Sequence, residues 1–151
     1  MDAGVSVDLQ TLLDEREIVA VALRYCRALD TKDWPALSEV FEPTSTAQLG
    51  SPDLLEGLAA IVARVRAALE HLDLSQHLVG NHEVAVDGDE ATHRCYLHAQ
   101  HVRRSATGGP NYVVAGRYED RLVRTAAGWR IAHRTLTVMW TDGNVAVVRG
   151  G

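Results

Sequence analysis

The chain has 151 residues, of which 46% are hydrophobic and 23% charged, and its formal net charge is −5 at pH 7. This length predicts one domain with a sizeable core that needs no metal or disulfide. The acidic balance argues against a sequence-independent nucleic-acid binder, which needs a basic face. No apolar run approaches the roughly 20 residues that cross a bilayer, and no secretory pattern opens the chain, so we expect a cytoplasmic protein and no membrane partner.

Apolar side chains at helical spacing predict a first helix over residues 8–30. Its expected buried stripe consists of Leu12, Val19, Leu23, Cys26 and Leu29.

Two further helices are predicted before the sheet. Asp33 is the expected N-cap of the second helix, Pro35 fits its first turn, and Pro43 ends it. Its buried side is expected to comprise Leu37, Val40 and Phe41. Residues 44–49 are expected to be irregular or a strand, and apolar spacings of three and four predict a third helix over residues 53–70.

From Ser75 onward the period changes to two, which indicates strands. Turn signals separate the expected strands Val84–Val86, Thr92–Val102, Tyr112–Val123 and Trp129–Trp140. Their short connections predict an antiparallel meander, and helices followed by strands indicate an α+β fold. Strands of more than ten residues must curl, so a sheet with helices on its concave side should enclose a small-molecule pocket.

Asp30 and two histidines are candidates for chemistry inside this pocket. Asp30 continues the apolar stripe of the first helix inward, although an aspartate at a helix end can equally form a turn. In the stretch SQHLVGNHEV, strand alternation puts His77 and Asn81 on one face and His82 on the other. One of the two histidines should point inward, and spacing alone does not choose between them.

The next strand carries three more histidines. His93 and His101 share its more apolar face, which makes His101 a pocket candidate, whereas His98 stands among polar neighbours. Because the three do not share one face and no carboxylate cluster accompanies them, we expect no metal site. Cys26 and Cys95 are interpreted as buried free thiols.

Five arginines alternate with apolar residues on the last two strands: Arg117, Arg121, Arg124, Arg130 and Arg134. We expect them to pair with acidic residues on a solvated or subunit-facing surface, with an anion site as the alternative. The sequence has no phosphate-cradling glycine loop, no nucleophile elbow and no dinucleotide motif, so no cofactor is expected.

The segments RYCRALDTKDWPALSEVF, SQHLVGNHEVAVDGDEA and GRYEDRLVRTAAGWRIAHRTLTVMW resemble the SnoaL-like branch of the nuclear-transport-factor-two-like superfamily, over nearly the whole chain. The resemblance implies a single cone-shaped α+β domain over residues 1–151, with three helices packed in a strongly curved, mostly antiparallel sheet. We expect residues 1–7 and 144–151 to be flexible.

Within this branch the resemblance is to scytalone dehydratase and hexachlorocyclohexane dehydrochlorinase, which use a histidine held by an aspartate. Asp30 and His77 match those positions, and His101 matches a second histidine of the dehydratase. The two catalytic tyrosines of the dehydratase are not matched, since Leu29 takes one place. Its pocket serine and asparagine fall on Gly116 and Tyr118. The resemblance therefore implies a retained catalytic pair but not a scytalone substrate.

The implied activity is that of a cofactor-independent lyase or isomerase acting on a small cyclic or polyketide-like molecule. His77 would be the general base, oriented by Asp30. His101 or Tyr118 would assist the leaving group or polarise a carbonyl. The side chains expected to bind substrate are Tyr25, Asn81, Leu97, Tyr118 and Trp140. The alternative is a non-catalytic binding or assembly module of the same fold, and we expect a homodimer or homotrimer in either case.

Overall fold

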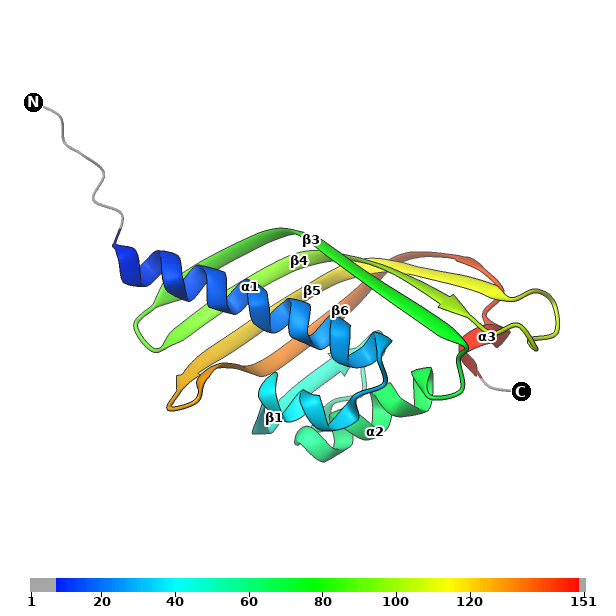
Figure 1. Ribbon diagram of the computed structural model, residues 1–151, viewed down its shortest axis with the longest axis horizontal. Coiled ribbons are helices and arrows are strands. Elements are labelled where there is room, and N and C mark those ends of the chain that lie inside the picture. Colours follow the sequence, from blue (N-terminus) through cyan, green and yellow to red (C-terminus); the bar gives the residue numbers. More distant parts are fainter. Residues whose placement is uncertain (1–7, 150–151) are drawn as a thin grey trace, which may run out of the picture.

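The computed structural model describes residues 8–149 as one curved layer of strands wrapped around a long helix (Figure 1). Residues 1–7 and 150–151 lie outside the described residues. The elements in chain order are α1 (Leu9–Asp30), the 3₁₀ helix η1 (Trp34–Glu39), β1 (Phe41–Leu49), β2 (Leu55–Glu56), α2 (Leu58–Leu69), β3 (Leu74–Asp87), β4 (Glu90–Val102), β5 (Asn111–Thr125), β6 (Gly128–Gly143) and α3 (Ala146–Arg149).

The six strands form one sheet in the order β2-β1-β6-β5-β4-β3. All neighbouring strands are antiparallel except β1 and β6, which are parallel. The predicted α+β cone with a mostly antiparallel sheet is thereby confirmed. In Figure 1, α1 runs along the sheet and α2 lies near the C-terminal end of α1. No helix of residues 8–149 is long and apolar enough to span a membrane.

The face that α1 buries is rotated from the predicted stripe. Ile18, Val21 and Tyr25 are at most 2% exposed, whereas Leu12 and Leu23 are 48% and 52% exposed, so the prediction is wrong for these two leucines. Apolar spacing cannot distinguish two adjacent faces that both carry large apolar side chains. The contacts with the sheet select the face.

A polar anchor on the buried face helps to fix this orientation. Both carboxylate oxygens of Asp14 accept hydrogen bonds from Arg124, at 2.7 and 2.8 Å, and Oδ1 also accepts one from the Trp129 indole at 3.1 Å. The hydrogen bonds from Arg124 hold the pKa of Asp14 well below its usual value. These contacts tie the first turns of α1 to the β5–β6 hairpin.

The segment between the first and third helices is more strand-like than predicted. The second helix is a 3₁₀ helix capped by Asp33, as expected, but Phe41 begins β1 instead of continuing the helix. The third helix starts at Leu58, five residues later than predicted. Leu55 and Glu56 pair with β1 before it, and Gly57 at the helix start has a φ of +89°, which a helix interior does not allow.

A bulge in β3 changes which side chains face inward. Gly80 pairs with Tyr96 and Glu83 with Arg94, so Asn81 and His82 together lie opposite a single residue of β4. Asn81 has a φ of +55°, in the left-handed region. His77 on one side of the bulge and His82 on the other therefore both point toward the interior, which strict alternation does not permit.

The C-terminal segment returns to the body of the protein. Val147 of α3 is fully buried, and its carbonyl accepts a hydrogen bond from Nε2 of His71 at 3.1 Å. Residues 144–149 thus pack against the fold next to α2 and the ends of β4 and β5.

Candidate active site

Asp30 and His77 meet at the C-terminal end of α1. Nδ1 of His77 lies 2.6 Å from Oδ1 of Asp30, and the backbone N–H of His77 donates to Oδ2 at 2.9 Å. The hydroxyl of Ser75 donates to Oδ1, also at 2.9 Å. Asp30 is the last residue of α1 and uses its carboxylate for β3, not for a turn of its own chain. The structure thus joins the two residues that the sequence singled out.

The surroundings of Asp30 favour its ionised form. Burial raises the pKa of this carboxyl, but the hydrogen bonds from the ring and backbone of His77 outweigh burial, so the pKa lies below its ordinary value. A carboxylate can only accept, which requires the proton of a neutral His77 ring to be on Nδ1. The Nε2 lone pair of His77 is then directed away from Asp30. The His77 side chain is only 5% exposed.

His101 lies beside His77 on β4. The two rings meet edge to face with centroids 5.8 Å apart. Nδ1 of His101 donates to the backbone carbonyl of Tyr112 at 3.2 Å, so a neutral His101 ring also carries its lone pair on Nε2. Burial, assisted by the nearby His77, lowers the pKa of His101 to about 4. His101 is therefore neutral at pH 7 and accepts hydrogen bonds through Nε2.

A cavity of about 120 Å³ borders both histidines. Three of the side chains predicted to bind substrate, namely Tyr25, Leu97 and Tyr118, lie along it. The remaining lining is mostly apolar and comes from both helices and the sheet: Leu29, Leu49, Arg64, Val65, Ala68, Leu69, Ala99, Val114 and Leu136. The cavity thus combines the ring nitrogens of His77 and His101 with mostly apolar walls.

The tyrosines of this cavity flank a buried arginine. The guanidinium of Arg134 lies 4.5 Å from the ring centroid of Tyr25 and 4.0 Å from that of Tyr118. Burial raises the pKa of both phenols, so both hydroxyls stay protonated at neutral pH and can donate hydrogen bonds.

Arg134 itself is fully buried, which corrects the prediction of a surface arginine. It donates from Nε and Nη2 to the two oxygens of Asp120, at 2.7 and 2.8 Å. Attraction to Asp120 keeps the pKa of Arg134 above its usual value despite burial, which acts in the opposite direction. Alternation placed Arg134 on the outer face, but the register shifts between β5 and β6 turn it inward.

The structure does not bring Asn81 and Trp140 to this cavity. Both lie in a hollow on the outer face of the sheet, together with Leu78, Tyr96 and His98. Asn81 is turned outward by the bulge in β3. The Trp140 ring is half exposed and contacts His98, with centroids 5.7 Å apart. Gly116, where the dehydratase has a serine, is buried so close to the Thr137 carbonyl that a side chain would clash.

Sequence reasoning missed a second polar cluster on the inner face of the sheet. His82, His93 and Cys95 hold their ligating atoms within 4.8 Å of one another. Cys26 and Cys95 are buried free thiols, as predicted, and burial raises the pKa of Cys95 to about 12. The cluster could have been predicted only if the sequence had indicated a bulge between Gly80 and Glu83. The residues of this segment indicate a continuous strand instead.

The lowered pKa of His101 predicts an acid-sensitive stability. Unfolded histidine titrates near 6.5, so between about pH 6.5 and 4 the unfolded chain binds a proton that folded His101 does not, and unfolding becomes easier as the pH falls. Urea unfolding at several pH values gives the free energy of unfolding as a function of pH. Between about pH 4 and 6.5 the slope of this dependence should be smaller in His101→Asn than in the wild type, by on the order of 1 kcal/mol per pH unit. His98→Asn, on the outer face, is the control. Equal slopes in the wild type and His101→Asn would contradict the prediction.

The fold and the site together define a cone-shaped α+β protein with a carboxylate–imidazole pair in an apolar cavity. The family model of the SnoaL-like domain matches residues 10–135, and the chain belongs to this family. A nuclear-transport-factor-two-like protein of Novosphingobium aromaticivorans is 33% identical, with a TM-score of 0.70 and coverage of 92% of this chain and 89% of that one, which places the family within the nuclear-transport-factor-two-like superfamily. An uncharacterized protein of Mycobacterium tuberculosis is 29% identical over 126 residues, which cover 82% of this chain and 84% of that protein.

Solved structures of other proteins share the fold. A protein of Kribbella flavida is 27% identical, with a TM-score of 0.84 and coverage of 93% of this chain and 99% of that one. Two more distant structures share the fold. A protein of Novosphingobium aromaticivorans proposed to be a scytalone dehydratase has a TM-score of 0.80 at 20% identity, covering 89% of each chain. A hexachlorocyclohexane dehydrochlorinase has a TM-score of 0.79 at 12% identity, covering 90% of this chain and 92% of that one.

Proposed function

We propose that the chain is a cofactor-independent enzyme that removes a proton from a small cyclic molecule, as a dehydratase-like lyase or an isomerase. The observation that carries the proposal is the 2.6 Å contact between Nδ1 of His77 and Asp30 beside an apolar cavity. The ionised carboxylate orients the ring and stabilises the imidazolium that forms when Nε2 takes a proton. His77 is the proposed general base, and Asp30 positions it.

The proposed reaction begins at a carbon acidified by a neighbouring carbonyl. The C–H bond breaks, its proton goes to Nε2 of His77, and its electron pair forms an enolate. Loss of a β-hydroxyl group, which recovers the proton from His77, gives an alkene and water. Return of the proton to another carbon gives an isomer. Elimination and isomerisation share the same first step. In both reactions the proton taken by His77 is returned, so no co-reactant is needed.

The other polar groups of the cavity have distinct proposed roles. Neutral His101 has no proton on Nε2, so we assign it to accept a hydrogen bond from a substrate hydroxyl, not to protonate a leaving group. The hydroxyls of Tyr25 and Tyr118 are the proposed donors to the developing enolate. Leu97 contributes apolar wall.

The size of the cavity restricts the substrate. An apolar protein cavity of about 150 Å³ accommodates benzene. The cavity of about 120 Å³ therefore suits a substrate whose buried part is no larger than a single ring. This favours monocyclic compounds over fused aromatic systems.

The test is a panel of monocyclic β-hydroxy ketones and halogenated rings incubated with the protein in D₂O. Proton NMR should show exchange at the acidic carbon and formation of either an alkene or a shifted isomer. Product identity separates lyase from isomerase. Compounds that bind without exchange or turnover would instead support a non-catalytic binding module.

We also propose that the chain forms a homodimer or homotrimer in the cytoplasm. Leu78, Tyr96, Met139 and Trp140 are each at least half exposed and line one hollow on the outer face of the sheet. Exposed apolar patches of this kind mark contact surfaces. Light scattering should give a multiple of the monomer mass, reduced by Trp140→Glu but not by Leu54→Glu, which changes an exposed leucine elsewhere. A monomeric wild type would contradict this.

A further inference from the structure

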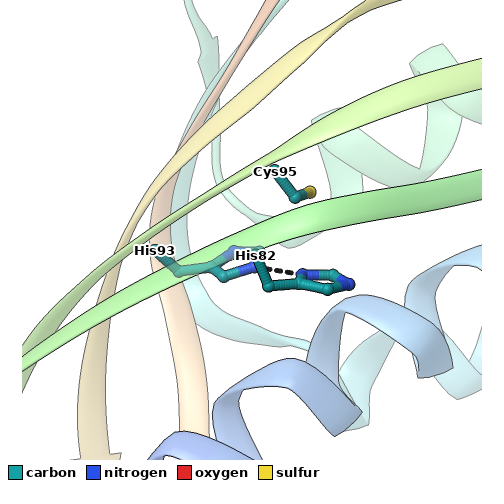
Figure 2. A group of neighbouring side chains, drawn as sticks. All are labelled: His82, His93 and Cys95. Atoms are coloured by element: carbon teal, nitrogen blue, oxygen red, sulfur yellow. Dashed lines mark hydrogen bonds between the residues drawn. The ribbon is translucent and has the colours of Figure 1, made fainter.

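His82, His93 and Cys95 form a cluster on the inner face of the sheet, apart from the cavity of His77. Figure 2 shows His82 on β3 with its ring directed toward His93 on β4, and Cys95 next to them. Nδ1 of His82 lies 2.9 Å from Nε2 of His93, and the two rings stack with centroids 5.2 Å apart. His93 and Cys95 are at most 3% exposed. None of the three lines the cavity of His77.

The bulge in β3 assembles the cluster. Because Asn81 and His82 share one partner position on β4, the residue opposite them is Cys95. His93 and Cys95 are two residues apart on β4 and so face the same side. The extra residue in β3 therefore brings two imidazole nitrogens and a thiol together.

A buried carboxylate orients His93. Nδ1 of His93 lies 2.8 Å from Oδ2 of Asp120, which Arg134 holds through both carboxylate oxygens. Since the carboxylate only accepts, the His93 proton is on Nδ1 and the Nε2 lone pair faces His82 and Cys95. A carboxylate that fixes the far nitrogen of a histidine is the arrangement found behind metal-ligating histidines.

We propose that Nδ1 of His82, Nε2 of His93 and Sγ of Cys95 bind a divalent ion of the zinc class. Two imidazoles and a thiolate suit this borderline-soft ion, whose bonds are about 2.0–2.1 Å to nitrogen and 2.3 Å to sulfur. Ligand atoms around such an ion are about 3–4 Å apart, so atoms that lie within 4.8 Å of one another reach it by shifts of about 1 Å.

Two proton movements accompany binding. The thiol of Cys95 loses its proton to solvent as the metal–sulfur bond forms. The ring proton of His82, now donated from Nδ1 to His93, moves to Nε2, so that both imidazoles present lone pairs to the ion. One proton is released for each ion bound, and no redox partner is needed.

The fourth coordination position has a route to solvent. His82 is partly exposed and, with Val84, borders a groove along α1 that includes Leu12, Glu15, Val19 and Leu23. Three protein ligands with an accessible fourth position resemble the coordination of a catalytic zinc site more than that of a closed structural one. A water molecule is the expected fourth ligand.

Cobalt titration of the chelator-treated 151-residue chain tests the proposal. One equivalent of Co²⁺ should produce the visible absorption of a tetrahedral site and a near-ultraviolet thiolate charge-transfer band, both removed by Zn²⁺. Cys95→Ser should abolish the charge-transfer band. His82→Gln, at a partly exposed position where folding is tolerant, should weaken Co²⁺ binding at least tenfold. Circular dichroism checks that each variant is folded.

Cys26→Ser is the matched control, because Cys26 is the other buried free thiol and lies outside the cluster. It should retain the spectrum and affinity of the wild type. The proposal is overturned if the wild type shows no thiolate band at stoichiometric Co²⁺, or if His82→Gln binds as tightly as the wild type. In that case the cluster is a hydrogen-bonded histidine pair of purely structural role.

Discussion

Replacement of His77 by asparagine is expected to lower the turnover of any substrate found in the panel by about two to four orders of magnitude. The asparagine amide can still donate to Asp30, so the contact between α1 and β3 is retained while the base is lost. Asp30→Asn should lower turnover by a smaller factor, because His77 is still present as the base. The variant loses the carboxylate that orients the ring and stabilises the imidazolium. Steady-state kinetics of both variants would measure the difference.

The control for these variants is Gln76→Asn, which changes an exposed side chain of β3 on the opposite face of the sheet. Its kcat and its unfolding curve should match those of the wild type. The general-base assignment would be abandoned if His77→Asn retained wild-type turnover. A variant that loses activity only because it unfolds would be recognised by its circular dichroism spectrum.

The second large effect concerns stability. Arg134→Met should lower the free energy of unfolding by about 3–5 kcal/mol, because it leaves the carboxylate of Asp120 buried without its cationic partner. The arginine and the aspartate are 0% and 1% exposed in their side chains, so solvent cannot replace the lost interaction. Urea unfolding followed by tryptophan fluorescence measures the change. Trp129 is buried in the core and reports on it.

Arg117→Met provides the matched control, since Arg117 lies on β5 with a side chain 43% exposed and only a 3.7 Å contact to Glu119. The free energy of unfolding of Arg117→Met should lie within about 0.5 kcal/mol of the wild-type value. The double variant Arg134→Met with Asp120→Asn should be more stable than Arg134→Met alone, because the side chain left at position 120 is then an uncharged amide. Equal stability of Arg134→Met and Arg117→Met would refute the proposed role of the buried pair.

Much of the architecture could be predicted because local signals were strong. The change from helical to alternating periodicity near Ser75 and the glycine-containing turns located β4, β5 and β6. Their lengths predicted the curl. The strand expected at Val84–Val86 was too short, because β3 already begins at Leu74 and continues through the bulge. The parallel pairing of β1 with β6 was not predicted, because it joins distant segments and leaves no pattern in either one. The start of α2 was placed too early because Leu54, four residues before Leu58, continues its apolar spacing.

The candidate site was predictable only in part, for a different reason. Neither Asp30 nor His77 is distinctive by spacing alone, and their joint match to one motif singled them out. Asn81 was assigned inward by strict alternation, which a single extra residue in β3 reverses. The same extra residue turned His82 inward, and so the second cluster escaped notice. Strict alternation also assigned Arg134 to the outer face of the sheet, whereas its side chain is fully buried.

The stack of Tyr25, Arg134 and Tyr118 has a further consequence for the interior of the cone. The phenol rings face the cavity of His77, whereas the guanidinium continues through Asp120 to His93. All of these side chains are almost completely shielded from solvent. The stack thus lies between the cavity of His77 and the second histidine–aspartate pair, His93 with Asp120. A substitution at Arg134 therefore changes both the wall of the cavity and the contacts that orient His93.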